Sequence, residues 1–322
     1  MTVAEEIVAP PPTGAAAPAR RRRRRRLDRE ALAGYAFISP WIIGFLLFTV
    51  ISMSYSAYLS ATDYDLATNT APWVGGENYA QLVQDPKVLQ SLGNTFTYAL
   101  MSVPLETAFA LLLALLLMSI PRGQGFFRVL YYLPKMTPAV ATAAVFLLLL
   151  NGNRGAVNQL LGFFGIQGPQ WLIDPDWIIP SIVLMSAWAV AGSMIIYMAA
   201  LQSVPVDLYE AAALDGAGSV RRFWRITVPL ISPTTFFLVI TNTIASLQVF
   251  DQAYLLFYRD ASSSAPSASL FYGIYLYQQA FQQFNFGLAA AMAWVLFAII
   301  MVITLIQVKV SKRLVHYQGE SR

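Results

Sequence analysis

A series of long apolar segments constrains this chain more than any other feature. The hydrocarbon core of a bilayer is about 30 Å thick, and a helix needs about 20 predominantly apolar residues to cross it. The segments that meet this requirement are Leu32–Leu59, Asn94–Met118, Val129–Leu150, Trp177–Leu201, Pro229–Phe257 and Phe286–Val308. The sequence therefore predicts an all-α integral membrane protein with six transmembrane helices.

Charged residues are too scarce for a soluble chain. They make up 12% of the sequence, and hydrophobic residues make up 57%, whereas soluble domains carry about 25% charged residues. The first apolar segment follows a basic region, as a cleaved signal peptide would, but it is longer than the usual apolar stretch of about 7–15 residues. We therefore expect it to be a retained helix.

The residue inventory argues against several kinds of chemistry. The chain has no cysteine and one histidine, His316, which leaves no thiolate site and makes a Ser-His-Asp triad or a histidine metal cluster hard to build. A P-loop needs Gly-x-x-x-x-Gly-Lys-Ser/Thr, and none of the lysines Lys87, Lys135, Lys309 and Lys312 has that context. We expect a chain that is not an enzyme and that binds no metal and no cofactor.

Basic residues predict how the chain is oriented. With the N-terminus inside, the inner segments hold the run Arg20–Arg26, Arg29 and most other basic residues, whereas the outer loops hold only Lys87, Arg154 and Arg259. Basic residues mark the cytoplasmic side, so we expect both termini there. An arginine run can also bind nucleic acid, but its place before an apolar segment favours contact with anionic lipid.

The expected domain organisation follows from these segments. Residues 1–30 form a disordered basic cytoplasmic tail, because the stretch before the arginines is rich in alanine and proline. Residues 31–93 hold the first transmembrane helix and an outer loop. Residues 94–309 form the core transmembrane domain, and residues 310–322 form a second cytoplasmic tail.

The inner loop between the fourth and fifth spans differs from the other loops. Asp207 can cap a short helix, with Glu210 as its capping-box partner. Gly216 can then stop that helix, and Ser219 can cap a second helix that carries basic and aromatic side chains. Pro229 suits the first turn of the next span. We therefore predict a short two-helix cytoplasmic loop, which either enters a groove on a partner or lies on the lipid surface.

This loop resembles the signature loop of binding-protein-dependent ABC importer permeases, which have a MetI-like transmembrane fold. In that family Glu-Ala-Ala is followed, after three intervening residues, by Gly and then, after nine further intervening residues, by Ile-x-Leu-Pro. Val228 stands here in place of the usual leucine. The resemblance assigns an ATPase-coupling loop to Glu210, Ala211, Ala212, Asp215, Gly216, Ile226 and Pro229.

Further short motifs resemble the carbohydrate, or maltose-type, branch of this family. They are Asn78-Tyr79 after Gly75-Gly76, Asn94-Thr95, Gly155 with Asn158, and Phe250-Asp251. One departure follows the last motif, where the branch often continues into a Gly-Gly-Pro loop and this chain has Tyr258–Ser263 instead.

The resemblance implies a permease subunit of an ATP-driven importer in the bacterial plasma membrane, carrying a sugar or sugar derivative. It also implies partners: a second homologous permease, two ATPase subunits that use the ATP, and an extracellular solute-binding protein. The lipid bilayer is the remaining partner, and none is a nucleic acid. The helix around Glu210–Gly216 would sit in a cleft of one ATPase.

The solute path is less well specified by the sequence. Ionisable residues inside spans are functional candidates, and sugars are bound by carboxylates, amides and aromatic faces. The candidates are Glu106, Tyr98, Trp188, Tyr197, Asn242, Gln248 and Asp251. The alternative for each of them is hydrogen bonding and packing between helices.

Other functions remain open at this point. A secondary transporter driven by an ion gradient would favour acidic residues in several spans, and a permease for a non-sugar solute would share most of these features. A membrane-embedded enzyme would need a clustered catalytic set, and a membrane scaffold would need none.

Overall fold

A computed structural model describes residues 29–64, 66, 68–258 and 265–314. Within these ranges the regular structure is helical, apart from one isolated β-bridge between Thr62 and Trp73. The run Arg20–Arg26, Arg259 and His316 lie outside the described residues. The disordered tail therefore stays a prediction.

The chain divides into two compact units, Met1–Ser54 and Tyr55–Arg322. The first span is a continuous helical run, Leu32–Leu59, of 28 residues. It consists of α1 (Arg29–Gly44), the π-helix η1 (Phe45–Val50) and α2 (Ile51–Leu59). These bounds match the span that the sequence predicts.

The second and sixth spans are single long helices. Helix α4 (Pro86–Met118) has 33 residues and starts well before the predicted Asn94, because Asp85 caps it by accepting the backbone N–H of Lys87 at 2.8 Å. Helix α15 (Phe286–Leu314) has 29 residues. The first turns of α4 contain polar residues, so a prediction based on apolar runs places its start too late.

The third and fourth spans are each divided into two helices by a bend, which the sequence pattern does not predict. Helices α5 (Gln124–Met136) and α6 (Ala139–Leu149) meet at 96°, and α8 (Pro175–Trp188) and α9 (Ala191–Gln202) meet at 51°. Pro138 explains the sharper bend, since it forces the residue before it out of the helical region. Four helices are thus long and apolar enough to span a membrane among the described residues, and up to six if each bent pair is one span.

The fifth span is a longer helical run than the sequence predicts. It begins with α11 (Ser219–Arg222) and the π-helix η2 (Phe223–Thr227), which lead directly into α12 (Val228–Leu247). Helix α13 (Asp251–Phe257) follows after a short break. The second short helix of the predicted loop is therefore the start of the fifth span rather than a separate element.

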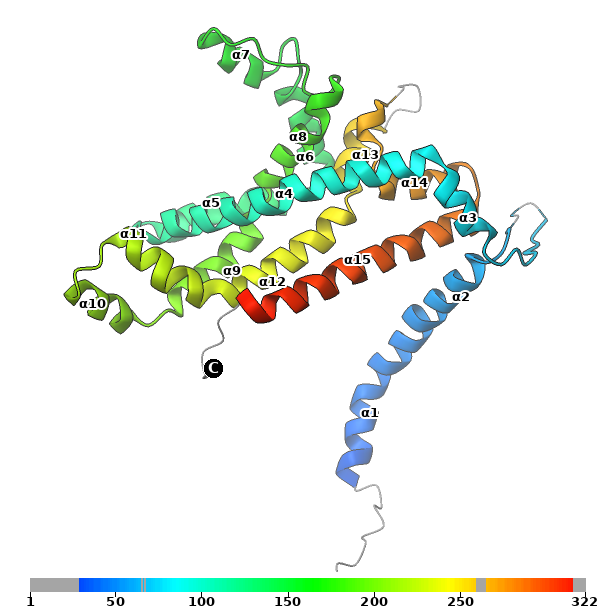
Figure 1. Ribbon diagram of the computed structural model, residues 1–322, viewed down its shortest axis with the longest axis horizontal. Coiled ribbons are helices and arrows are strands. Elements are labelled where there is room, and N and C mark those ends of the chain that lie inside the picture. The colour runs from blue at the N-terminus through cyan, green and yellow to red at the C-terminus, as the bar shows by residue number, and fades with distance from the viewer. Residues whose placement is uncertain (1–28, 65, 67, 259–264, 315–322) are drawn as a thin grey trace, which may run out of the picture. The chain divides into compact units, whose positions relative to one another are not determined.

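Short helices connect the spans. They are α3 (Glu77–Gln84), α7 (Ala156–Phe163), α10 (Val206–Leu214), the 3-10 helix η3 (Ser267–Ser269), α14 (Tyr272–Tyr277) and the π-helix η4 (Gln278–Gln282). Figure 1 shows α4, α12 and α15 side by side, with α10 and α11 at one end of this bundle and α3 and α14 at the other.

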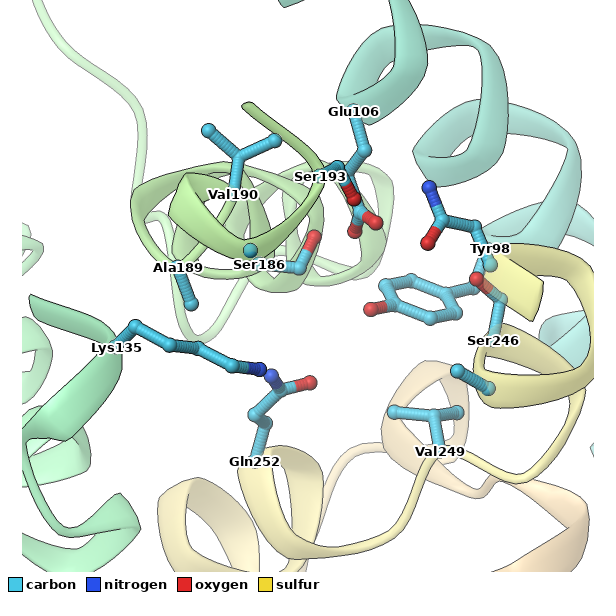
Figure 2. A pocket seen from close by; sticks show the side chains of 13 residues that line it. Tyr98, Glu106, Lys135, Ser186, Ala189, Val190, Ser193, Ser246, Val249 and Gln252 are labelled. Carbon is cyan, nitrogen blue, oxygen red and sulfur yellow. The ribbon is translucent and has the colours of Figure 1, made fainter. Parts of the chain in front are cut away.

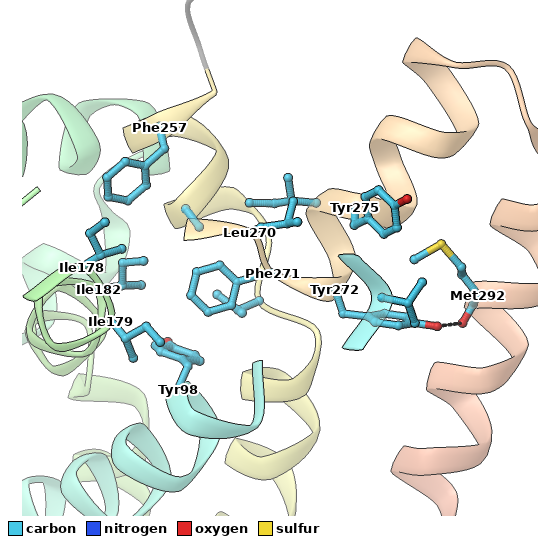
Figure 3. Close-up of a cluster of buried hydrophobic side chains, with 14 of the residues drawn as sticks. Tyr98, Ile178, Ile179, Ile182, Phe257, Leu270, Phe271, Tyr272, Tyr275 and Met292 are labelled. Carbon is cyan, nitrogen blue, oxygen red and sulfur yellow. Dashed lines mark hydrogen bonds between the residues drawn. The ribbon is translucent and has the colours of Figure 1, made fainter. Parts of the chain in front are cut away.

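Aromatic and aliphatic side chains fill a core near α14. Figure 3 shows Tyr98 of α4 facing Phe271 edge-on, with ring centroids 5.7 Å apart. Tyr272 donates its hydroxyl to the backbone carbonyl of Met292 at 3.0 Å. The backbone N–H of Tyr272 in turn donates to Thr95 Oγ1 at 3.0 Å. These bonds fix α14 between α4 and α15.

A second core lies between α4, α9 and α12. Ala110 and Ala114 of α4 are completely buried there, beside Met194 and Tyr197 of α9 and Ile231 of α12. Small residues let membrane helices approach closely, and hydroxyls can bond across the contact. This close contact of α4, α9 and α12 positions the cavity described next.

Candidate functional site

A polar cavity of about 220 Å³ lies among the apolar spans. Its walls come from α4, α5, α8, α9, α12 and α13, so segments far apart in the sequence meet there. Figure 2 shows the side chains that face it. The polar lining residues are Tyr98, Glu106, Lys135, Ser186, Ser193, Asn242, Ser246 and Gln252.

Two ionisable residues of opposite sign line this cavity. Glu106 projects from α4 and Lys135 from the end of α5. Charges in a membrane interior are costly and are retained where they face a cavity or each other. The cavity lining therefore includes one acidic and one basic side chain.

Hydroxyl and amide groups complete the lining. Tyr98 is almost fully buried and its hydroxyl points into the cavity. Ser102 and Ser246 bond to each other at 3.0 Å and hold α4 against α12. The amide nitrogen of Asn242 is buried and makes no hydrogen bond to another group of the described chain. A free buried donor in a polar cavity is suited to a ligand that carries acceptor oxygens.

The structure brings together only some of the residues that the sequence assigns to the solute path. Tyr98, Glu106 and Asn242 line the cavity. The remaining candidates do not: Trp188 is half exposed and lies edge-on to Phe146, Tyr197 is buried in the α4–α9–α12 core, and Gln248 and Asp251 are exposed.

Five polar lining residues are absent from the sequence prediction. They are Lys135, Ser186, Ser193, Ser246 and Gln252. Lys135 could have been noticed, because it is a charged residue within an apolar segment. Its predicted place was near the inner end of the third span. The 96° bend brings it into the cavity wall instead. The serines give no sequence signal, because serine is common at helix contacts.

At the opposite end of α9, helix α10 carries the Glu-Ala-Ala motif and stops where the glycine predicts. Gly216 has a φ of +75°. Its N–H donates to the carbonyl of Ala213 at 3.0 Å, and the N–H of Ala217 donates to that of Ala212 at 2.9 Å. This pair of bonds is a Schellman motif, which needs a left-handed residue that glycine provides without strain.

The predicted caps of this loop are wrong. Pro205 is the N-cap of α10, and no side chain caps that end, so Asp207 lies in the first turn and forms no capping box with Glu210. Gly218, rather than Ser219, is the N-cap of α11. Pro205 sets the backbone at the start of α10 but has no side-chain acceptor. Neither Asp207 nor Glu210 therefore caps this helix.

The loop presents an exposed surface at the end of the bundle. Glu210, Ala211 and Asp215 are exposed, and Ala212, Ile226 and Pro229 are half-buried. Large apolar side chains are also exposed beside them, namely Val206 (65%), Leu214 (90%), Val220 (71%) and Trp224 (64%). Exposed apolar groups bordered by charges are typical of a protein or membrane interaction site.

One side-chain contact ties α10 to the fifth span. The hydroxyls of Tyr209 and Thr227 lie 2.8 Å apart. Tyr209 packs against the α4–α9–α12 core, as does Ile226, and Thr227 is buried within the π-helix η2. Helix α10 has no buried residue of its own, so this contact is central to its attachment.

Long apolar helices around a polar cavity, with an exposed loop at one end, are the features of a membrane transport subunit. A family model described as "Binding-protein-dependent transport system inner membrane component" matches residues 106–316. The chain belongs to this family, and it is a permease subunit of an ABC importer rather than an enzyme. Membership also decides against the secondary transporter and the scaffold.

The relatives agree with this assignment over most of the chain. A probable ABC transporter permease protein of Bacillus subtilis, YesP, is 41% identical over 91% of this chain and 95% of its own length. The trehalose/maltose transport system permease protein MalF of Thermococcus litoralis is 30% identical over 88% of this chain and 95% of its own length. A bacterial ABC transporter involved in alginate import has a TM-score of 0.77 and 26% identity, covering 90% of this chain and 98% of its own.

Proposed function

We propose that this permease carries a sugar or sugar derivative through the cavity between α4, α5, α8, α9, α12 and α13. Several relatives are named as permeases for sugars, among them proteins for trehalose/maltose and for arabinooligosaccharides. The observation that carries the proposal is the lining of the cavity, in which a phenol, hydroxyls, amides and one charge of each sign face a common space. Such groups donate to and accept from sugar hydroxyls.

The proposed assembly follows the family. A second homologous permease completes the path, two ATPase subunits use the ATP, and an extracellular binding protein delivers the solute. A related alginate transporter is known in complex with a pentasaccharide-bound periplasmic protein. With the arginine run Arg20–Arg26 and both termini in the cytoplasm, the exposed α10 surface faces an ATPase. Domains 1–30, 31–93, 94–309 and 310–322 are proposed with the bounds given above.

The coupling role of the loop rests on its exposure. Glu210 is exposed and available to basic groups of an ATPase, and the apolar side chains around it offer contact area. Ala211 and Ala212 keep the surface of α10 small enough to enter a cleft. None of the four lysines has the sequence context of a P-loop, so we assign the nucleotide to the partner.

Two glutamines provide a matched test of the solute path. Gln252 lines the cavity, whereas Gln248 is exposed outside it. We expect Gln252→Leu to reduce uptake of the sugar that the cognate binding protein retains by about tenfold, the value of one lost hydrogen bond to substrate. Gln248→Leu should leave uptake within about twofold. Equal effects of the two changes on uptake at equal membrane levels would contradict the proposed path.

A further inference from the structure

Helix α7 and the turn that follows it expose large apolar side chains. Phe163 is 87% exposed and Phe164 is 78% exposed, with Leu160 and Ile166 exposed beside them. These four residues are called the α7 face. The opposite side of the helix packs inward, where Val157 contacts the small core of α6 and α8. Four large apolar side chains in so short a segment need a partner that removes them from water.

The α7 face is held rigidly rather than carried on a loose loop. Asn158 donates to the carbonyls of Gly152 at 2.7 Å and Pro169 at 3.1 Å, and its oxygen accepts the indole N–H of Trp171 at 2.6 Å. A Cβ on Gly168 would collide with the Asn158 side chain. These contacts fix α7 relative to the segments on both sides of it.

Helix α7 follows closely after the end of the third span in the chain. Residues 150–155 alone separate it from α6, and Asn151 folds that connection into a tight turn by accepting the N–H of Arg154 at 2.9 Å. Trp171 and Trp177 lie edge-on with ring centroids 5.0 Å apart at the start of α8. The amphipathic indole rings of tryptophan concentrate at the membrane–water interface.

Charge distinguishes the occupants that could cover this face. Residues 155–173 contain no charged side chain, whereas protein interfaces are bordered by a polar rim. The other connection at the far end of the bundle carries Asp63, Glu77, Asp85 and Lys87, which suits a water-soluble partner better. Phenylalanine and leucine side chains beside one another on a helix suit the boundary between headgroups and acyl chains.

We propose that α7 is an interfacial helix whose face, formed by Leu160, Phe163, Phe164 and Ile166, inserts into the lipid headgroup boundary. The lipid then supports α7 and the helices on either side of it, α6 and α8. Ser186, near the end of α8, lines the cavity. This role is independent of which solute is carried.

The absence of cysteine from the chain allows a single label to test the proposal. Phe163→Cys and Arg154→Cys are each labelled with an environment-sensitive fluorophore in the purified full chain, which is reconstituted into phosphatidylcholine vesicles. Arg154 is exposed in the same connection and is the matched control. The measurements are quenching by aqueous iodide and by lipids brominated at shallow or deep acyl positions.

We expect the label at position 163 to be quenched more strongly by shallow brominated lipid than by deep, and to be protected from iodide. The label at position 154 should show the reverse preference, with strong iodide quenching and little quenching by lipid. Equal iodide quenching at both positions would overturn the proposal. Protection at position 163 that requires added binding protein would also overturn it, because the face would then be a protein-docking surface.

Discussion

The phenolic oxygen of Tyr209 lies 2.8 Å from the hydroxyl oxygen of Thr227, and this contact joins the exposed helix α10 to the fifth span. Thr227 is 4% exposed. Asn242, in the cavity wall, lies on the same helical run, about 22 Å further along at about 1.5 Å per residue. A displacement of α10 can therefore reach the cavity through one rigid helix.

Removing either hydroxyl should uncouple ATP hydrolysis from uptake. Each of Tyr209→Phe and Thr227→Val leaves the other partner unsatisfied, which costs about 1–3 kcal/mol. We expect each variant to lower solute uptake per ATP hydrolysed several-fold, measured in reconstituted vesicles, while the apparent affinity for the loaded binding protein is unchanged. The double variant should be no worse than either single variant.

Thr227→Ser is the control for this prediction, because serine keeps the hydroxyl and removes one methyl group. It should retain most of the coupling ratio. Additive losses in the double variant, or a loss with Thr227→Ser equal to that with Thr227→Val, would show that the two hydroxyls do not act as a pair.

The left-handed turn at Gly216 should be needed for coupling and not for folding. With a φ of +75°, Gly216→Val is strained by about 1 kcal/mol or more, whereas Gly216→Asn is tolerated better. Because Gly216 is exposed and has open space around it, we expect normal amounts of both variants in the membrane, with uptake strongly reduced only for valine. Loss of the valine variant from membranes would instead make the turn a folding element.

The sequence predicts the membrane spans of this chain better than its site. Long apolar runs locate the spans because hydrophobic length is a local property, and the first span was predicted with its observed bounds. The Glu210–Gly216 spacing likewise predicts a short helix and its stop. The capping prediction at Asp207 failed because Pro205 lies two residues upstream and sets the entry to α10 without a side-chain acceptor.

The cavity depends on long-range geometry that no local pattern records. Lys135 enters it because of the bend between α5 and α6, and Gln252 enters because α13 starts after a break. Gln248, only a turn earlier, faces away. The two glutamines cannot be told apart from residue type alone. The break between α12 and α13 places one in the cavity wall and the other outside it.

A hydrogen bond between Tyr275 and the carboxylate of Asp85 should stabilise the end of the bundle that holds α14. Burial, and then the adjacent carboxylate, raises the pKa of Tyr275 to about 12. The raised pKa means that the stabilisation is complete below the ordinary pKa of 10.0 and is lost as the pH rises towards 12. Tyr275→Phe should therefore lower the unfolding temperature in detergent by several degrees at pH 7, an effect of about 1–3 kcal/mol. An unchanged temperature would show that the bond contributes nothing.

The charges of Glu106 and Lys135 should depend on each other. Each lines the cavity from a different helix, with Glu106 half-buried and Lys135 exposed, and removing one leaves the other without an opposite charge among apolar spans, where ionisable residues are costly. We expect Glu106→Gln and Lys135→Met each to reduce the amount of folded protein in membranes several-fold, measured by resistance to protease and by quantitative blotting. The double variant should recover folded protein to near the wild-type level but not recover uptake, because the cavity then lacks both charges. Folded levels in the double variant below those of both single variants would show that each residue is stabilised by other groups and that the two do not form a pair.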